Sequence, residues 1–148
     1  MSVTLRKVTN DTFRACIGLE VREDQKGYVA SNMYSLAEAQ ADGVSEPRAI
    51  YADEEMVGFI MYDVEPEEGR GYIPRLMVDA VHQGNGYGRA AMQQVIDLFV
   101  ANPDCKEIRT SIHPDNERAR ALYLSLGFEL TGEMSDGEAV MRMPLKSR

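Results

Sequence analysis

The sequence predicts a single α/β (α+β) domain that covers residues 1–148 and is built on a mixed, mostly antiparallel central sheet flanked by about four helices. Two observations predict this class. Three consecutive strand patterns with short links, at residues 48–52, 56–64 and 72–78, are typical of an antiparallel meander. A strand, a helix and another strand then follow over residues 72–112, which requires a parallel pair joined by a right-handed crossover. The sequence contains no internal repeat or linker that would divide it.

The N-terminal segment predicts a strand followed by a helix. Residues 3–8 alternate between apolar and polar side chains, as in a half-buried strand. Asn10 or Asp11 can cap a helix that continues to Val21, with Phe13 on its apolar face. We expect this helix to pack against the sheet.

The next segment predicts an excursion before the second strand. Residues 22–32 are mostly polar. This segment is too long for a tight turn, and its pattern is too irregular for a single helix. Ser35 and Glu38 have the spacing of a capping box, which predicts the start of a short second helix that ends near Gly43. The expected arrangement is therefore helix, loop, helix.

The fourth strand carries an unusual residue at its centre. Pro74 has no backbone N–H to donate, and proline is rare in central strands. We expect it to mark a bulge, or a place where pairing with a neighbouring strand is interrupted.

The second half of the chain alternates helices and strands. Apolar residues recur at helical spacing in residues 88–101, and residues 107–112 predict the fifth strand. A helix follows the loop 113–116 and ends before Gly127. A closing hairpin is predicted from strands at 128–133 and 139–144, because an Asp-Gly turn signal separates them.

Composition narrows the class of protein. The formal net charge is −8, which argues against a nucleic-acid partner because nucleic-acid binding needs concentrated Lys and Arg. No apolar run has the length of a membrane span or of a signal peptide, so a cytoplasmic protein without a membrane partner is expected. Cys16 and Cys105 lie far apart without metal-ligand spacing, and we expect reduced, buried thiols and no metal.

A glycine-rich loop marks the expected site. Residues 83–88 place three glycines between a buried strand and a helix, an arrangement that offers backbone N–H groups and a positive helix end to an anion. Two common phosphate loops do not fit. Gly88 is not followed by the Lys of a P-loop, and the glycine spacing is one residue short of a dinucleotide fingerprint.

Two motifs in order carry a resemblance to a known family. The first is Q-x-x-G-x-G, at Gln83, Gly86 and Gly88. The second is N-x-x-A-x-x-L-Y-x-x-x-G-F, which runs from Asn116 to Phe128 and matches at every specified position. Together they resemble the GNAT N-acetyltransferase superfamily over essentially the whole chain. The resemblance implies that strands four and five are parallel and splayed, and that the protein moves an acetyl group directly from acetyl-coenzyme A to a primary amine.

The resemblance also implies the cofactor-binding residues and one catalytic residue. Tyr123 occupies the position of the general acid that protonates the departing thiolate, although helical spacing alone favours a packing role beside Leu122. A backbone amide between Leu76 and Val78 is expected to stabilise the developing oxyanion. The expected contacts with the coenzyme come from Leu76, Met77, Val78, Gln83, Gly84, Asn85, Gly86, Tyr87, Gly88, Arg89, Asn116 and Tyr123.

The acceptor amine is inferred from the excursion. Its V-x-x-x-Q-x-x-Y-V pattern, which begins at Val21, is similar to that of bacterial spermine/spermidine (diamine) acetyltransferases. The residues expected to bind this small cationic amine are Glu20, Glu23, Asp24, Tyr28 and Arg75. The acids can instead form a solvated face. The sequence does not assign the general base, for which the candidates are Glu20, Glu23, Asp79 and a water relay.

Other functions remain compatible with the sequence. The acceptor can be a different amine, such as an amino acid, an aminoglycoside-like antibiotic or a protein N-terminus. Pro74 favours this alternative, because some polyamine enzymes are expected to carry an acidic residue at that position. The fold can also serve a non-catalytic acyl-coenzyme A sensor. A homodimer is possible, as in many proteins of the superfamily.

Overall fold

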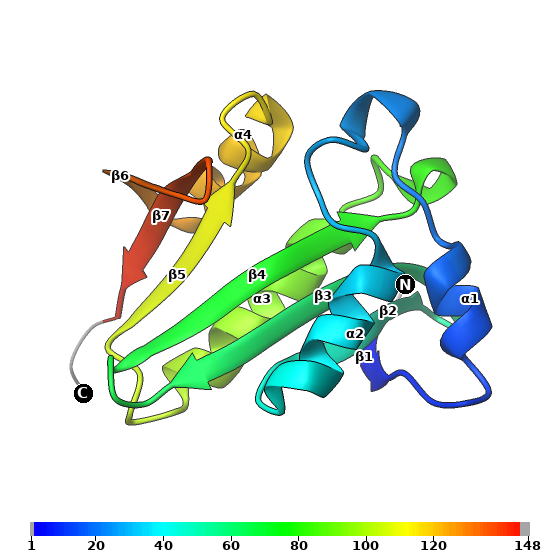
Figure 1. The fold of residues 1–148 in the computed structure, drawn as a ribbon, viewed down its shortest axis with the longest axis horizontal. Coiled ribbons are helices and arrows are strands. Elements are labelled where there is room, and N and C mark those ends of the chain that lie inside the picture. The colour runs from blue at the N-terminus through cyan, green and yellow to red at the C-terminus, as the bar shows by residue number, and fades with distance from the viewer. Residues whose placement is uncertain (1, 146–148) are drawn as a thin grey trace.

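Seven strands form one sheet in the order β1-β2-β3-β4-β5-β7-β6, and helices cover both of its faces (Figure 1). The computed structural model describes residues 2–145. Its strands are β1 (Val3–Lys7), β2 (Glu46–Ala52), β3 (Glu55–Glu65), β4 (Arg70–Val78), β5 (Glu107–Ile112), β6 (Glu129–Ser135) and β7 (Glu138–Pro144). The helices are α1 (Phe13–Gly18), α2 (Asn32–Asp42), α3 (Tyr87–Val100) and α4 (Glu117–Leu126), with short 3-10 turns η1 (Glu23–Gln25) and η2 (Ala80–His82).

The sheet has the predicted mixed topology. Strands β1 to β4 are antiparallel neighbours, and β4 and β5 are parallel. Helix α3 makes the crossover between β4 and β5, and β7 lies between β5 and β6. Strand β5, Glu107–Ile112, has the bounds that were predicted for the fifth strand. The closing hairpin, β6 and β7, is also confirmed.

Two apolar clusters lie on opposite faces of the sheet. The larger one packs α3 and α4 against β2 to β5 and β7. It includes Phe99, whose ring sits so close to β4 that a Cβ on Gly71 would lie 2.6 Å from it. The smaller cluster packs α1 and α2 against the other face, and its buried residues are Cys16, Ala39, Phe59, Met61 and Met77. Figure 1 shows α2 in front of the sheet and α3 behind it.

The first helix is shorter than predicted, and its cap was predicted wrongly. It spans Phe13–Gly18 and begins after Thr12 instead of Asn10 or Asp11. Thr12 closes a turn by accepting a hydrogen bond from the Thr9 N–H at 2.8 Å. Distant residues end the helix early. Asn32 donates to the Cys16 carbonyl at 2.9 Å, and the following chain becomes extended at Leu19.

The second helix begins earlier than the capping-box pattern predicted. Ser31 is its N-cap and accepts a hydrogen bond from the Tyr34 N–H at 3.1 Å. Ser35 therefore lies inside the helix, where it is fully buried. Its hydroxyl has no hydrogen-bond partner among the described residues. Gly43 ends the helix as predicted, with a left-handed φ of 69°.

Both cysteines are buried and unpaired in the part of the chain that the structure describes, as the sequence predicted. Burial raises the pKa of the Cys16 thiol to about 11, so this sulfur stays protonated and unreactive. Between residues 2 and 145, no helix combines the length and the apolar character that a membrane crossing requires.

Candidate active site

The centre of the site is a fork in the sheet between β4 and β5. The two strands pair only from Arg70 to Ile73 on β4, where Ile73 is the partner of Thr110. The Thr110 hydroxyl donates to the Ile73 carbonyl at 2.7 Å and closes the base of the fork. Pro74 is the next residue, and the β3–β4 register shifts beside it. Both expectations for Pro74, a bulge and an interruption of pairing, are confirmed.

Beyond Pro74, β4 turns polar backbone groups toward the fork. The Asp79 N–H donates to the Val57 carbonyl at 2.8 Å, so Asp79 faces β3. Antiparallel pairing alternates hydrogen-bonded and non-bonded pairs, which places the backbone groups of Val78 and Leu76 on the opposite edge. The Val78 carbonyl indeed accepts from Gln83 at 2.9 Å rather than from β3. The fork is therefore lined by main-chain groups as well as by side chains.

The glycine-rich loop leads from the end of β4 into α3. Gly84 and Gly86 have φ values of 85° and 81°, which only glycine adopts without strain. A Cβ on either would meet no atom within 4 Å, so the backbone there faces open space. Gly86 is the N-cap of α3, which has neither a side-chain cap nor an acidic residue in its first turn within the described chain. The positive end of α3 is thus available to an anion.

The Gln83 side chain joins three parts of the site. Its amide exchanges two hydrogen bonds with the amide of Gln25 in η1, at 2.8 and 3.2 Å. Its Oε1 also accepts from Arg118 of α4 at 3.1 Å. Together with the bond to Val78, these contacts fix the loop between the excursion, β4 and α4.

A cavity of about 260 Å³ runs along the loop and the fork. Its walls are mostly apolar, and its polar side chains come from the excursion, η2, the glycine-rich loop and the first turns of α3 and α4. The lining residues are Val21, Gln25, Tyr28, Val29, Leu76, Met77, Val78, His82, Gln83, Gly84, Gly86, Tyr87, Gly88, Arg89, Asn116, Arg118, Ala119 and Leu122.

Tyr123 lies at the base of the fork, in the larger apolar cluster. Its side chain is buried, and its ring packs against Phe128 with centroids 5.7 Å apart. Burial raises the pKa of the Tyr123 phenol to about 12, against a smaller lowering by the neighbouring Thr110 hydroxyl. The phenol is therefore a protonated donor at neutral pH and cannot act as a base there.

Comparison with known proteins gives this arrangement a family. The model of the acetyltransferase (GNAT) family matches residues 6–128. The chain belongs to the GNAT family. It is 32% identical over 95% of its length to a spermine/spermidine N(1)-acetyltransferase of Bacillus subtilis, and covers 97% of that relative.

Solved structures show the same GNAT fold. One is an aminoglycoside acetyltransferase in complex with coenzyme A, with a TM-score of 0.80 and 22% identity; the match covers 97% of this chain and 95% of that one. Another is the PaiA N-acetyltransferase of Thermoplasma acidophilum in complex with coenzyme A, with a TM-score of 0.73 and 15% identity; it covers 97% and 99%. At these identities the likeness concerns the fold.

The structure gathers most of the residues that the GNAT motifs predicted. All of the expected coenzyme contacts line the cavity except Asn85 and Tyr123. Asn85 braces the loop by donating to the His82 carbonyl at 2.9 Å. Asn116 caps α4 by accepting from the Ala119 N–H at 3.2 Å. Arg89 lines the cavity while donating to Ser125 at 2.7 Å.

The expected acceptor residues are dispersed. Tyr28 lines the cavity and packs against His113, with the two rings tilted and their centroids 4.9 Å apart. Glu20 and Glu23 are exposed and pair with Lys26, at 3.6 and 2.9 Å. The remaining two are Asp24, which pairs with Arg22 at 3.2 Å, and Arg75, which pairs with Glu38 at 3.1 Å. Asp79, a candidate base, accepts from the Glu20 N–H at 2.9 Å.

Arg118 and Gln25 are two of the cavity residues that the sequence-based prediction of the site did not include. Arg118 brings a guanidinium to the cavity from the first turn of α4, two positions after the Asn116 cap. That position alone could have suggested it. Gln25 belonged to the excursion pattern, but its pairing with Gln83 joins residues 58 positions apart and left no local signal.

Proposed function

We propose that the protein is an acetyl-coenzyme A-dependent N-acetyltransferase that acts on a primary amine of a small cationic substrate, with spermine or spermidine as the favoured acceptor. The observation that carries this proposal is the 32% identity to a named spermine/spermidine acetyltransferase over nearly the whole chain. The buried thiols support a reducing compartment such as the cytoplasm.

The residues of the cavity fit acetyl-coenzyme A. Gly84 and Gly86 leave open space against the backbone at the positive end of α3, where a pyrophosphate can approach the N–H groups. Arg89 and Arg118 bring positive charge to the same end. The mostly apolar walls that lead to the fork suit a pantetheine arm. When bound, the coenzyme supplies an acetyl group activated as a thioester.

The fork provides the groups that acetyl transfer needs. An N–H of Leu76 or Val78, on the edge turned away from β3, can donate to the thioester oxygen as it gains negative charge. The Tyr123 phenol can donate its proton to the sulfur that leaves. The Thr110 bond to Ile73 holds the base of the fork in place.

Charge supports a cationic acceptor. The net charge of −8 attracts a polyamine over long range. Tyr28 offers an aromatic face beside the cavity for an ammonium group. For Glu20 and Glu23 to bind the amine, Lys26 must give up its two ion pairs, so their contribution depends on rearrangement of an exposed network.

The test is release of free thiol from acetyl-coenzyme A with a panel of amines. The panel contains spermidine, spermine, putrescine, amino acids, an aminoglycoside and a short peptide. We expect the highest kcat/KM with spermine or spermidine. Faster turnover with another amine would replace the polyamine assignment and keep the acetyltransferase. Binding of acetyl-coenzyme A by calorimetry without turnover on any amine would favour a non-catalytic sensor.

A further inference from the structure

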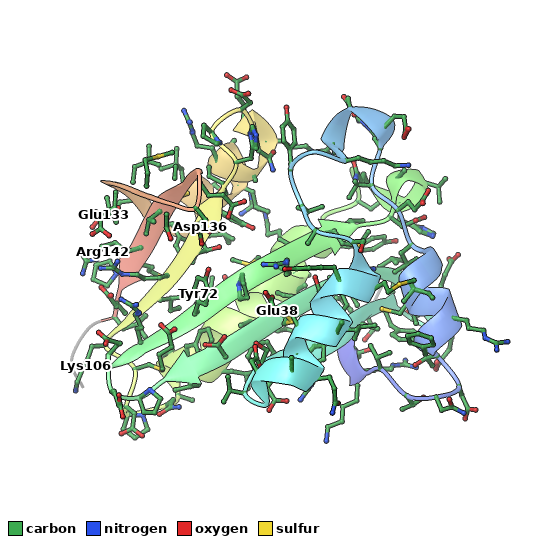
Figure 2. All side chains as sticks on the ribbon, viewed as in Figure 1. Glu38, Tyr72, Lys106, Glu133, Asp136 and Arg142 are labelled. Carbon is green, nitrogen blue, oxygen red and sulfur yellow. The ribbon has the colours of Figure 1, made fainter. Side chains whose placement is uncertain are left out.

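Three strands bring polar side chains together on the sheet face that carries α1 and α2. The residues are Tyr72 of β4, Ser111 of β5 and Glu138 of β7. The Ser111 hydroxyl donates to Glu138 Oε1 at 2.8 Å. It also neighbours the Tyr72 phenol, whose pKa it lowers against the larger effect of burial. Figure 2 shows Tyr72 between Glu38 on α2 and Asp136 in the β6–β7 turn.

Glu138 differs from two glutamates of the neighbouring strands, Glu107 and Glu133, in having no cationic partner among the described residues. Glu107 pairs with Arg109 and Arg142, at 2.8 and 3.0 Å. The exposed Glu133 reaches Arg109 at 3.5 Å. Glu138 is partly buried, yet it forms no ion pair with any residue from 2 to 145. Arginines thus neutralise Glu107 and Glu133, while between residues 2 and 145 no cation pairs with Glu138.

The charge of Glu138 acts on both phenols of the fork. It raises the pKa of Tyr72 on its own face and, from the other side of the sheet, that of Tyr123. Glu138 therefore lies within electrostatic range of the proposed proton donor. A partly buried carboxylate is costly without a counter-charge, and an ammonium ion can supply that charge. The adjacent Tyr72 ring adds a face suited to a cation.

We propose that Glu138 is a specificity-determining residue, which receives an ammonium group of the acceptor amine beside Tyr72 and is held in position by Ser111. This inference rests on the proposed acetyltransferase function. It places the acceptor on the α1/α2 face of the fork, while the coenzyme occupies the cavity along α3 and α4. The acceptor and the thioester then meet at the point where β4 and β5 separate.

The experiment compares Glu138→Gln with Glu133→Gln in steady-state acetylation of spermidine. Both changes remove one negative charge from the β6–β7 hairpin, but Glu133 already has Arg109 as its partner. We expect Glu138→Gln to raise the KM for spermidine about tenfold, the effect of losing one ion pair of about 1.4 kcal/mol. The kcat should change less than twofold. Glu133→Gln should behave like the wild type.

Two further measurements separate binding of the amine from a structural role. The Kd of acetyl-coenzyme A, from calorimetry, should be the same in both variants and the wild type. Ser111→Ala should raise the KM for spermidine by a smaller factor, because Glu138 keeps its charge but loses its hydrogen bond. Equal KM values for Glu138→Gln and Glu133→Gln, or a weakened coenzyme affinity in Glu138→Gln, would overturn the inference. Absence of transfer by the wild type would instead refute the proposed function.

Discussion

Burial determines what Tyr123 can do. Its phenol has a pKa of about 12, so it keeps its proton from acid pH to above pH 10. We expect Tyr123→Phe to lower kcat about 100-fold, the usual contribution of one proton donor, with the Kd of acetyl-coenzyme A unchanged. Wild-type turnover should show no alkaline loss from this group up to pH 10. Equal turnover of variant and wild type over the whole pH range would exclude the acid role.

Asp63 carries a stability cost at neutral pH. It is 8% exposed, and burial, with smaller contributions from Glu65 and Asp42, raises its pKa from 3.8 to about 6. A raised carboxyl pKa stabilises the fold only where the group is protonated, so this contribution is complete below about pH 4 and is lost as pH rises through 6. Each pKa unit corresponds to 1.36 kcal/mol, so the difference between a pKa of about 6 in the folded protein and the usual 3.8 corresponds to at most about 3 kcal/mol of stability.

We therefore expect Asp63→Asn to be more stable than the wild type above pH 6, by up to about 3 kcal/mol. The advantage should disappear near pH 4. Urea denaturation at pH 7.5 and at pH 4 measures both values. A variant that is less stable than the wild type at pH 7.5 would show that the ionised carboxylate has a stabilising partner.

At the level of the elements, we expect Ser31 and Ser35 to have opposite effects on the stability of α2. Ser31 caps the helix through the Tyr34 N–H, whereas the buried Ser35 hydroxyl has no hydrogen-bond partner among residues 2–145. We expect Ser31→Ala to cost about 1 kcal/mol and Ser35→Ala to gain about 1 kcal/mol, since alanine favours a helix and removes an unsatisfied hydroxyl. Thermal unfolding of the two variants checks this. Destabilisation by Ser35→Ala would mean that its hydroxyl is hydrogen-bonded.

The loop before α3 allows a matched comparison. Gly86 and Gly132 have φ values of 81° and 86°, and a Cβ on either would meet no atom within 4 Å. Valine at either position should cause similar backbone strain of about 1–3 kcal/mol. Only Gly86→Val should also weaken acetyl-coenzyme A binding, by at least about tenfold, because its branches occupy the space for the phosphates. Equal coenzyme affinity of the two variants in calorimetry would refute the cradle.

Elements with local signals were predictable, and those shaped by distant contacts were not. Asn116 and Gly127 bound α4 as their capping preferences predict. Helix α1 ends where Asn32 donates a hydrogen bond to the Cys16 carbonyl. Helix α2 is capped by Ser31 and not by the capping box predicted at Ser35. A distant contact therefore decided the end of α1, whereas the start of α2 was decided by a second local cap signal, Ser31 with Tyr34, that the prediction did not use.

At the scale of the whole molecule, the order of strands and helices along the chain predicted the fold more completely than the sequence predicted the site. A strand–helix–strand passage and a closing hairpin were enough to predict the parallel pair and the final hairpin. The family resemblance predicted the residues of β4, of the glycine-rich loop and of the α4 cap that line the cavity. Glu138 could not be assigned a role in advance, because its position beside Ser111 depends on the order of the strands in the sheet and on a contact between two of them.

The unequal apolar clusters on the two faces of the sheet imply unequal resistance to opening. The cluster beneath α1 and α2 is much the smaller, so fewer apolar contacts must break to detach these helices than to detach α3. We expect amide hydrogens of α2 to exchange with deuterium oxide faster than those of α3, through a sub-global opening that leaves the sheet intact. The α1/α2 face of the fork, where we propose that the acceptor binds, would then open transiently while the face that carries α3 stays closed. Equal protection of both helices would show a single cooperative unit.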